Sequence, residues 1–178
     1  MLSTASAQNT PAYLKSPSDW KFERLDFPLA FAPDLGYQGY EEIRFAPGMF
    51  DRTSEMYFTY MFVLALDGRN KMDEVVLCQL LEKYYKGLCR AVAEEKQLDI
   101  NLDEVTVQVA QHGKESFGAV VDLFDVFGNG KKMQVSMDIS LCLPQNNQQT
   151  LLIALASAQP KQSKAWEKLA QERDRMVL

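Results

Sequence analysis

The stretch KKMQVSMDISLCL, from Lys131 to Leu143, alternates between apolar and polar side chains. One parity carries Met133, Val135, Met137, Ile139, Leu141 and Leu143, and the other carries Gln134, Ser136, Asp138, Ser140 and Cys142. Because successive side chains of a strand point to opposite faces, this pattern predicts a strand with one face in the core and the other in solvent. Such strands are typical of antiparallel sheets covered on one side.

Three neighbouring segments are expected to extend this apolar face. Polar or glycine-rich joints separate strands predicted at Glu104 to Gln111, Phe117 to Phe127 and Gln149 to Ala158. Gly128-Asn129-Gly130 predicts a hairpin loop that sets Val121 opposite Met137 and Leu123 opposite Val135. Two more pairings are expected on the same face: Val105, Val107 and Val109 beside Ala119, Val121 and Leu123, and Leu151, Ile153 and Leu155 beside Ile139, Leu141 and Leu143.

The first half of the chain adds three strands and a long helix. The strands are WKFERLDF at 20–27, YEEIRFAP at 40–47 and EMYFTYMFVLALDG at 55–68, with an irregular connection rich in proline and glycine after the first. The run from Met56 to Leu66 has large residues on both parities, which predicts a central strand covered on both faces. From Asn70 to Lys96, apolar residues recur every three or four positions, which predicts an amphipathic helix that packs on the core.

The last segment, SKAWEKLAQERDRM at 163–176, predicts a second helix with Ser163 as its N-cap. The predicted fold class is therefore α+β, an antiparallel sheet of about seven strands with one long amphipathic helix after the third strand and a C-terminal helix. Residues 1–19 are small, polar and poor in core-forming side chains. We expect a flexible N-terminal tail at 1–19 and a single α+β domain at 20–178.

Composition excludes several classes of function. The 178 residues carry a net charge of −5, and their Lys and Arg residues are scattered among acids, which disfavours nucleic-acid binding. No apolar run reaches the roughly 20 residues that a membrane-spanning helix needs. Ala5-Ser6-Ala7 before Gln8 resembles the end of a signal peptide, but the apolar segment that should precede it is missing. Periplasmic or exported and cytoplasmic locations both stay open.

Motifs for catalysis, metals and cofactors are missing from the sequence. His112 is the single histidine and falls in a predicted turn, where a solvated loop residue is expected. Cys78, Cys89 and Cys142 are too widely spaced for a zinc site and are expected to be free thiols. The segment FGNGKK does not complete a phosphate-binding loop. We therefore predict no cofactor and no metal.

Aromatic and charged side chains gather between Tyr37 and Phe62, and such mixtures can line a pocket. The candidate residues for binding a ligand or partner are Tyr40, Glu42, Arg44, Asp51, Tyr57 and Tyr60. Glu42 and Arg44 share one parity of a strand, so an ion pair on the sheet is the plainer interpretation.

A resemblance covers about a quarter of the chain, roughly Trp20 to Leu66. The segment FPLAFAPDLGYQGYEEIRFAPGMFD, followed by SEMYFTYMFVLAL, resembles part of a family of uncharacterised bacterial, often exported, proteins. This resemblance implies no activity and no catalytic residue. The order of predicted elements is similar to that of PsbP/Mog1-like domains, which implies a binding or assembly module by analogy of architecture alone.

Two hypotheses of function follow. The first is a non-enzymatic binding domain whose partner, a protein or a small molecule, contacts the aromatic region or the second sheet face, formed by Gln108, Asp122, Phe124, Gln134, Ser136, Asp138 and Leu152. The second is a small-molecule hydrolase that uses carboxylates at Glu41, Glu42 and Asp51, with Arg44 as the anchor for an anionic group. The second predicts a pocket of several hundred Å³ that holds a carboxylate of raised pKa. A homodimer is compatible with both hypotheses.

Overall fold

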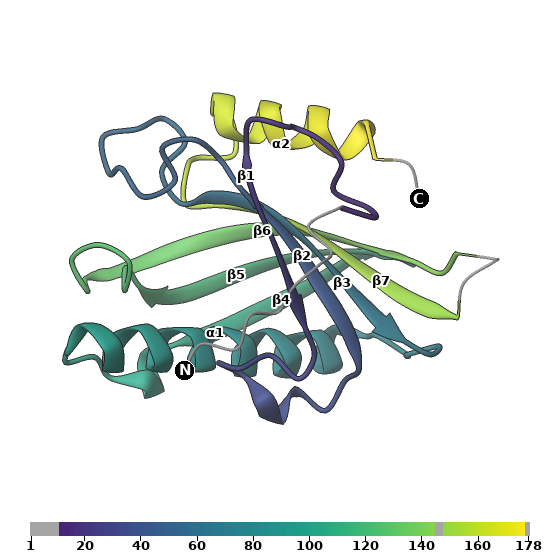
Figure 1. The fold of residues 1–178 in the computed structure, drawn as a ribbon, viewed down its shortest axis with the longest axis horizontal. Coiled ribbons are helices and arrows are strands. Elements are labelled where there is room, and N and C mark those ends of the chain that lie inside the picture. Colours follow the sequence, from purple (N-terminus) through teal and green to yellow (C-terminus); the bar gives the residue numbers. More distant parts are fainter. Residues whose placement is uncertain (1–10, 145–147, 177–178) are drawn as a thin grey trace.

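An antiparallel sheet of seven strands forms the framework of the computed structural model, which describes residues 11–144 and 148–176. Its strand order is β1-β2-β3-β7-β6-β5-β4 (Figure 1). The strands are β1 (Lys21–Asp26), β2 (Gly39–Phe45), β3 (Thr59–Asp67), β4 (Thr106–Gly113), β5 (Ser116–Phe124), β6 (Lys132–Cys142) and β7 (Gln149–Ser157). The helices are α1 (Glu74–Lys96) and α2 (Lys164–Asp174), with short 3₁₀ turns η1 (Pro33–Leu35) and η2 (Leu102–Glu104).

The α+β class, the long helix after the third strand and the C-terminal helix are confirmed. Helix α1 begins at Asp73, whose side chain accepts a hydrogen bond from the backbone N–H of Val76 at 3.0 Å. The apolar stripe predicted from its periodicity packs on one sheet face, where Leu77, Leu81 and Tyr85 are fully buried. This face also holds Met137 and Ile139, while Asp138 is exposed, as the alternation in β6 predicts.

The opposite face of β3 and β7 is covered by α2 and by the N-terminal segment at 11–20, which lies beside α2 (Figure 1). Trp166 and Leu169 of α2 pack in the same apolar cluster as Leu14, which is fully buried. In the described part of the predicted tail, the backbone N–H groups of Ala12, Tyr13 and Leu14 donate hydrogen bonds to the side chain of Glu42 in β2. Residues 1–10, with the Ala5-Ser6-Ala7 sequence, lie outside the described residues.

Strand registers differ from prediction in two places. In the β5–β6 pair, Val121 lies opposite Val135 and Ala119 opposite Met137, a shift of two residues that keeps every side chain on its predicted face. The reason is that the connection runs over 125–131 and is centred on Gly128, whereas the predicted loop at 128–130 is centred on Asn129. The pairing of β4 with β5 is confirmed by Val107 opposite Val121 and Val109 opposite Ala119.

The second difference is the parity of β7. Leu152 and Ala154 lie opposite Leu141 and Ile139, so they face α1, and Ile153 faces α2. Both parities of β7 are apolar, and the pattern therefore could not distinguish them. Leu152 and Phe124 are buried in the cluster under α1, which removes them from the second sheet face proposed as a contact surface.

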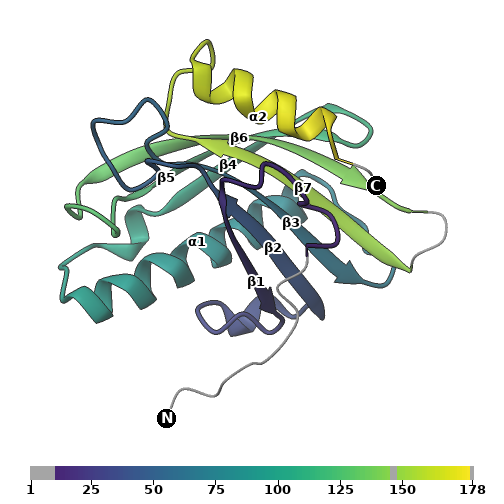
Figure 2. The same ribbon diagram turned by 45° about the horizontal axis from the view of Figure 1, so that its top comes forward.

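The sheet is strongly twisted, because β1, β2 and β3 run in a different direction from β4, β5 and β6 (Figure 2). This twist places the β1 edge beyond the part of the sheet against which most of α1 packs. Within the described residues, no helix is long and apolar enough to cross a membrane.

Candidate functional site

A cavity of about 300 Å³ lies between the α1-facing side of β1, β2 and β3 and helix α1. The strands contribute Lys21, Glu23, Leu25, Glu41, Ile43, Phe45 and Tyr60. The helix contributes Tyr84 and Leu88, and the connecting segments contribute Phe31, Met49, Phe50, Phe58 and Phe127. The volume is within the range of small-molecule sites, although at its lower end.

Aromatic rings form most of the wall. Phe31 packs edge-on against Tyr84 with ring centroids 5.0 Å apart, and Phe50 packs in the same manner against Phe127 at 5.4 Å. Phe58 contacts Tyr60 at 6.0 Å between centroids. Rings that hold one another in this way give the cavity a largely preformed shape.

Two backbone positions shape this wall. Gly87 of α1 lies against the loop before η1, and a Cβ atom at this position would come within 2.2 Å of the carbonyl oxygen of Phe31. Glycine therefore lets Phe31 lie over the cavity. Phe58 has a φ of 51°, an uncommon conformation for a bulky residue, while its side chain is 2% exposed. Strain of this kind is found preferentially at functional sites.

The side chain of Glu41 reaches the cavity from β2 and is fully buried. Its Oε1 accepts a hydrogen bond from the hydroxyl of Tyr84 at 2.7 Å, while its Oε2 has no hydrogen-bond partner among the described residues. Burial, opposed by the hydrogen bond from Tyr84 and assisted by the nearby charge of Glu23, raises the pKa of Glu41 to about 7. The carboxyl group therefore titrates near neutral pH with one oxygen unused.

The hydroxyl of Tyr60, a second polar group near the Glu41 carboxyl, is already hydrogen-bonded. The hydroxyls of Tyr60 and Tyr85 lie 2.6 Å apart, and Tyr85 donates to the sulfur of Met137 at 3.6 Å. Either hydroxyl of this pair can be the donor, and in both arrangements the oxygen of Tyr60 keeps a lone pair that can accept a hydrogen bond. Burial raises the pKa values of Tyr60, Tyr84 and Tyr85, which keeps all three hydroxyls protonated at neutral pH.

The mouth of the cavity lies at the β1 edge. Lys21 and Glu23 form an ion pair with 2.6 Å between Nζ and Oε1. Leu25 and Phe50 are exposed beside them, with 36% and 52% of their surface accessible. The cavity thus opens to solvent through an apolar rim that also carries the ion pair of Lys21 and Glu23.

Glu42 and Arg44 lie on the opposite sheet face and bind the N-terminal segment. The carboxylate of Glu42 accepts the backbone N–H groups of Ala12, Tyr13 and Leu14 at 2.6, 2.9 and 2.9 Å. The guanidinium of Arg44 donates from Nε to the carbonyl of Leu14 at 2.8 Å and from Nη1 to the carbonyl of Trp20 at 2.6 Å. The expected ion pair on the sheet exists instead between Arg24 and Glu42, at 3.7 Å.

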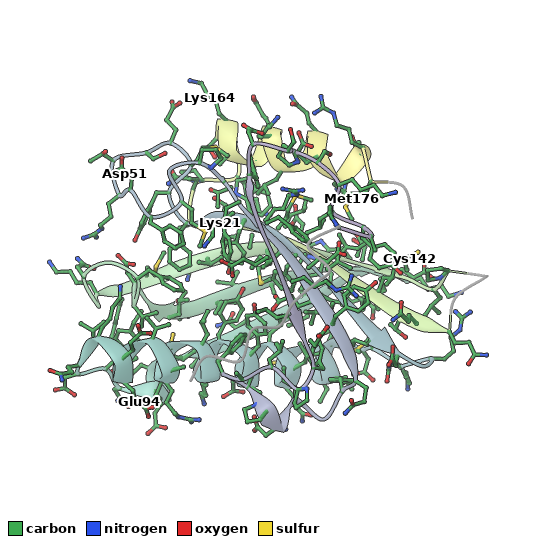
Figure 3. All side chains as sticks on the ribbon, viewed as in Figure 1. Lys21, Asp51, Glu94, Cys142, Lys164 and Met176 are labelled. Carbon is green, nitrogen blue, oxygen red and sulfur yellow. The ribbon has the colours of Figure 1, made fainter. Side chains whose placement is uncertain are left out.

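The remaining predicted residues are dispersed. Tyr40 stacks on Tyr13 on the Glu42 side, with the guanidinium of Arg24 at 3.6 Å from its ring centroid. Asp51 lies exposed at the outer end of the loop between β2 and β3, where it accepts hydrogen bonds from the backbone and side chain of Thr53 (Figure 3). Those two bonds lower its pKa.

Tyr57 is on the same loop, and burial followed by hydrogen bonding to Asp125 raises its pKa to about 12. Of the six predicted site residues, the structure therefore brings only Tyr60 to the cavity. Glu41, named for the hydrolase hypothesis, lines it as well.

Sequence reasoning missed several lining residues, because they lie far apart in the chain. Phe31 and Phe127 belong to irregular connections, and the periodicity of α1 indicates core packing for Tyr84 as for its other apolar residues. The one usable signal was a glutamate at an α1-facing position of β2, because Ile43 and Phe45, two and four residues after Glu41, are apolar residues of the same parity. In the described part of the chain, no three His, Cys, Asp or Glu side chains are grouped so as to hold a metal ion.

Comparisons of the chain with protein-family models, with curated proteins and with solved structures gave no match. Inference about function therefore depends on the geometry of the cavity.

Proposed function

We propose that the protein binds a small, largely apolar ligand in the cavity over β1, β2 and β3. The observation that carries this proposal is the fully buried Glu41, which presents an oxygen without a partner to an aromatic cavity of about 300 Å³. Buried polar atoms are almost always hydrogen-bonded, and an unsatisfied one costs free energy. A ligand that fills the cavity and donates a hydrogen bond to Glu41 would remove this cost.

The proposal is a specific form of the binding-domain hypothesis. A largely preformed apolar cavity with few polar groups is the usual architecture of a small-molecule site. Glu42, Arg44 and Asp51 make hydrogen bonds to other parts of the chain, outside the cavity.

A second candidate is catalysis by Glu41. It is favoured by the pKa of about 7, which suits a general acid or base at neutral pH. The hydrolase hypothesis also required Glu42, Asp51 and Arg44, and none of these lines the cavity. Binding is therefore the better-supported function, because it requires no second catalytic group.

Fluorescence of the uncharged probe N-phenyl-1-naphthylamine tests the proposal. We expect its emission to rise and saturate when it is titrated with the wild-type protein. Leu88→Phe places extra volume in the cavity and is expected to weaken probe binding by about tenfold or more. Val92→Phe is the matched control, since Val92 is also partly buried on α1, one turn further, and does not line the cavity.

Two results would contradict the proposal. One is emission that does not saturate with the wild-type protein, and the other is equal loss of binding in both variants. Circular dichroism of the two variants checks that each is folded.

Export and dimerisation stay separate proposals. A mature N-terminus at Gln8 or Asn9, determined by mass spectrometry on protein purified from its source, would support periplasmic export. Light scattering measures the oligomeric state directly.

A further inference from the structure

The charges that line the cavity favour a positively charged ligand. Glu41 and Glu23 are its acidic residues, and Lys21 is the one basic residue among the described side chains of its wall. Lys21 is paired with Glu23 at 2.6 Å, which leaves Glu41 without a cationic partner. An ionised Glu41 would therefore be a buried carboxylate with no counter-charge, an arrangement that a bound cation relieves.

The aromatic walls point the same way. Half of the residues that line the cavity are Phe or Tyr. The faces of aromatic rings carry negative electrostatic potential and attract ammonium groups, most strongly where water is excluded. The one basic side chain of the described wall, Lys21, is paired with Glu23 and is not free for an anionic ligand.

The cavity also supplies acceptors in the number that an ammonium group needs. A primary ammonium has three N–H donors and no acceptor. Glu41 has the free oxygen Oε2, and Tyr84 donates its own proton to Oε1, so that its oxygen still accepts. Tyr60 is the third acceptor, because its oxygen keeps a lone pair whichever hydroxyl of the Tyr60–Tyr85 pair is the donor. An alcohol has a single O–H donor and would therefore use only one of these acceptors.

We propose that the ligand of this cavity is a small apolar molecule with a protonated primary amine, whose ammonium group pairs with Glu41 while its apolar part lies among the aromatic rings. This inference rests on the proposed function and adds the chemical class of the ligand. The apolar rim at Leu25 and Phe50 is the side from which the ligand enters.

Isothermal titration calorimetry with hexylamine, 1-hexanol and hexanoate at about pH 8 tests the charge preference, because at that pH the amine and Glu41 are both charged. We expect hexylamine to bind at least about tenfold more tightly than 1-hexanol, and hexanoate to bind most weakly. Glu41→Gln keeps the shape of the side chain and is expected to lower hexylamine affinity by about tenfold while changing 1-hexanol affinity by less than about threefold.

Glu95→Gln is the matched control, because it removes one negative charge from an exposed position of α1. It is expected to leave all three affinities unchanged. Equal binding of hexylamine and 1-hexanol by the wild-type protein would overturn the amine inference and leave the proposed function intact. If the wild-type protein does not bind hexylamine, the amine inference is overturned. If it binds neither hexylamine nor N-phenyl-1-naphthylamine, the proposed function is overturned as well.

Discussion

Glu41 and Glu42 are consecutive residues of β2, and their fully buried carboxylates lie on opposite faces of the sheet in different chemical environments. Glu41 receives one hydrogen bond from Tyr84 and keeps one oxygen without a partner. Glu42 receives three backbone N–H groups and has Arg24 at 3.7 Å. Adjacent residues with the same side chain therefore have different roles, one in the cavity and one in the structure.

Glu41 is expected to make stability depend on pH. Its pKa is about 7 in the folded protein, against 4.5 for an ordinary glutamate, with Glu23 from β1, Tyr84 from α1 and Tyr60 from β3 as its titratable neighbours. The folded state therefore holds a proton that the unfolded chain releases. Its contribution to stability is complete below about pH 4.5 and is lost as the pH rises through 7, a change of roughly 3 kcal/mol.

Urea unfolding of the wild-type protein and of Glu41→Gln, at several pH values between about 5 and 8, measures this contribution. The unfolding free energy of the wild-type protein relative to Glu41→Gln should fall with rising pH, because only the wild-type protein has Glu41 to ionise. The other titrating groups are common to both proteins and cancel in the difference. Glu95→Gln should follow the wild-type curve. Parallel curves for wild type and Glu41→Gln would show that Glu41 is not desolvated.

Glu42 is expected to hold the N-terminal segment on the sheet. Glu42→Ala leaves the N–H groups of Ala12, Tyr13 and Leu14 without their acceptor, and the expected loss is about 3 kcal/mol of unfolding free energy. Amide hydrogen exchange at these three positions should accelerate selectively. Glu55→Ala removes a glutamate whose pair with Lys164 is 73% exposed on each side, so it should cost less than about 0.5 kcal/mol. Unchanged protection of the three amides in Glu42→Ala would contradict this assignment.

The sequence predicted the fold well where one parity or one helical stripe was apolar. In β6, polar Ser136 and Asp138 alternate with apolar residues such as Met137, so only one orientation places the apolar side chains in the core. That orientation is observed. In β7 both parities are apolar, since the strand is covered by α1 on one face and by α2 on the other. Its register could not be derived from hydrophobicity, because a slip of one residue exchanges one apolar set for another.

The site was predictable only in part. The region from Tyr37 to Phe62 does contribute Glu41, Ile43, Phe45 and Tyr60 to the cavity. Two of its other charged residues, Glu42 and Arg44, bind the segment at 11–20, and nothing in that small, polar stretch marks Leu14 as a core residue. Pairing between a carboxylate and backbone amides 28 to 30 residues away has no local sequence signature.

The three cysteines are expected to react with alkylating reagents at different rates. Cys89 is a buried residue of α1, and burial raises the pKa of its thiol, whereas Cys78 and Cys142 are partly accessible. Because the thiolate is the reactive form, Cys89 should be alkylated by iodoacetamide only after unfolding. Peptide mass spectrometry with and without urea measures this order, and alkylation of Cys89 at the rate of Cys142 in the native protein would contradict it.

Gly87→Ala tests whether the close contact between α1 and the loop before η1 shapes the cavity. Alanine should favour the helix by about 1 kcal/mol, yet its Cβ would lie 2.2 Å from a backbone oxygen of Phe31, which cannot move as a flexible side chain would. We expect a net loss of about 1–2 kcal/mol and weaker binding of N-phenyl-1-naphthylamine, because displacement of Phe31 opens the wall against Tyr84. Ala91→Gly, at an exposed position of α1, changes helix propensity alone and should reduce stability without reducing probe binding. If Gly87→Ala were as stable as the wild type and bound the probe equally well, the loop could not be packed on α1 as closely as the structure has it.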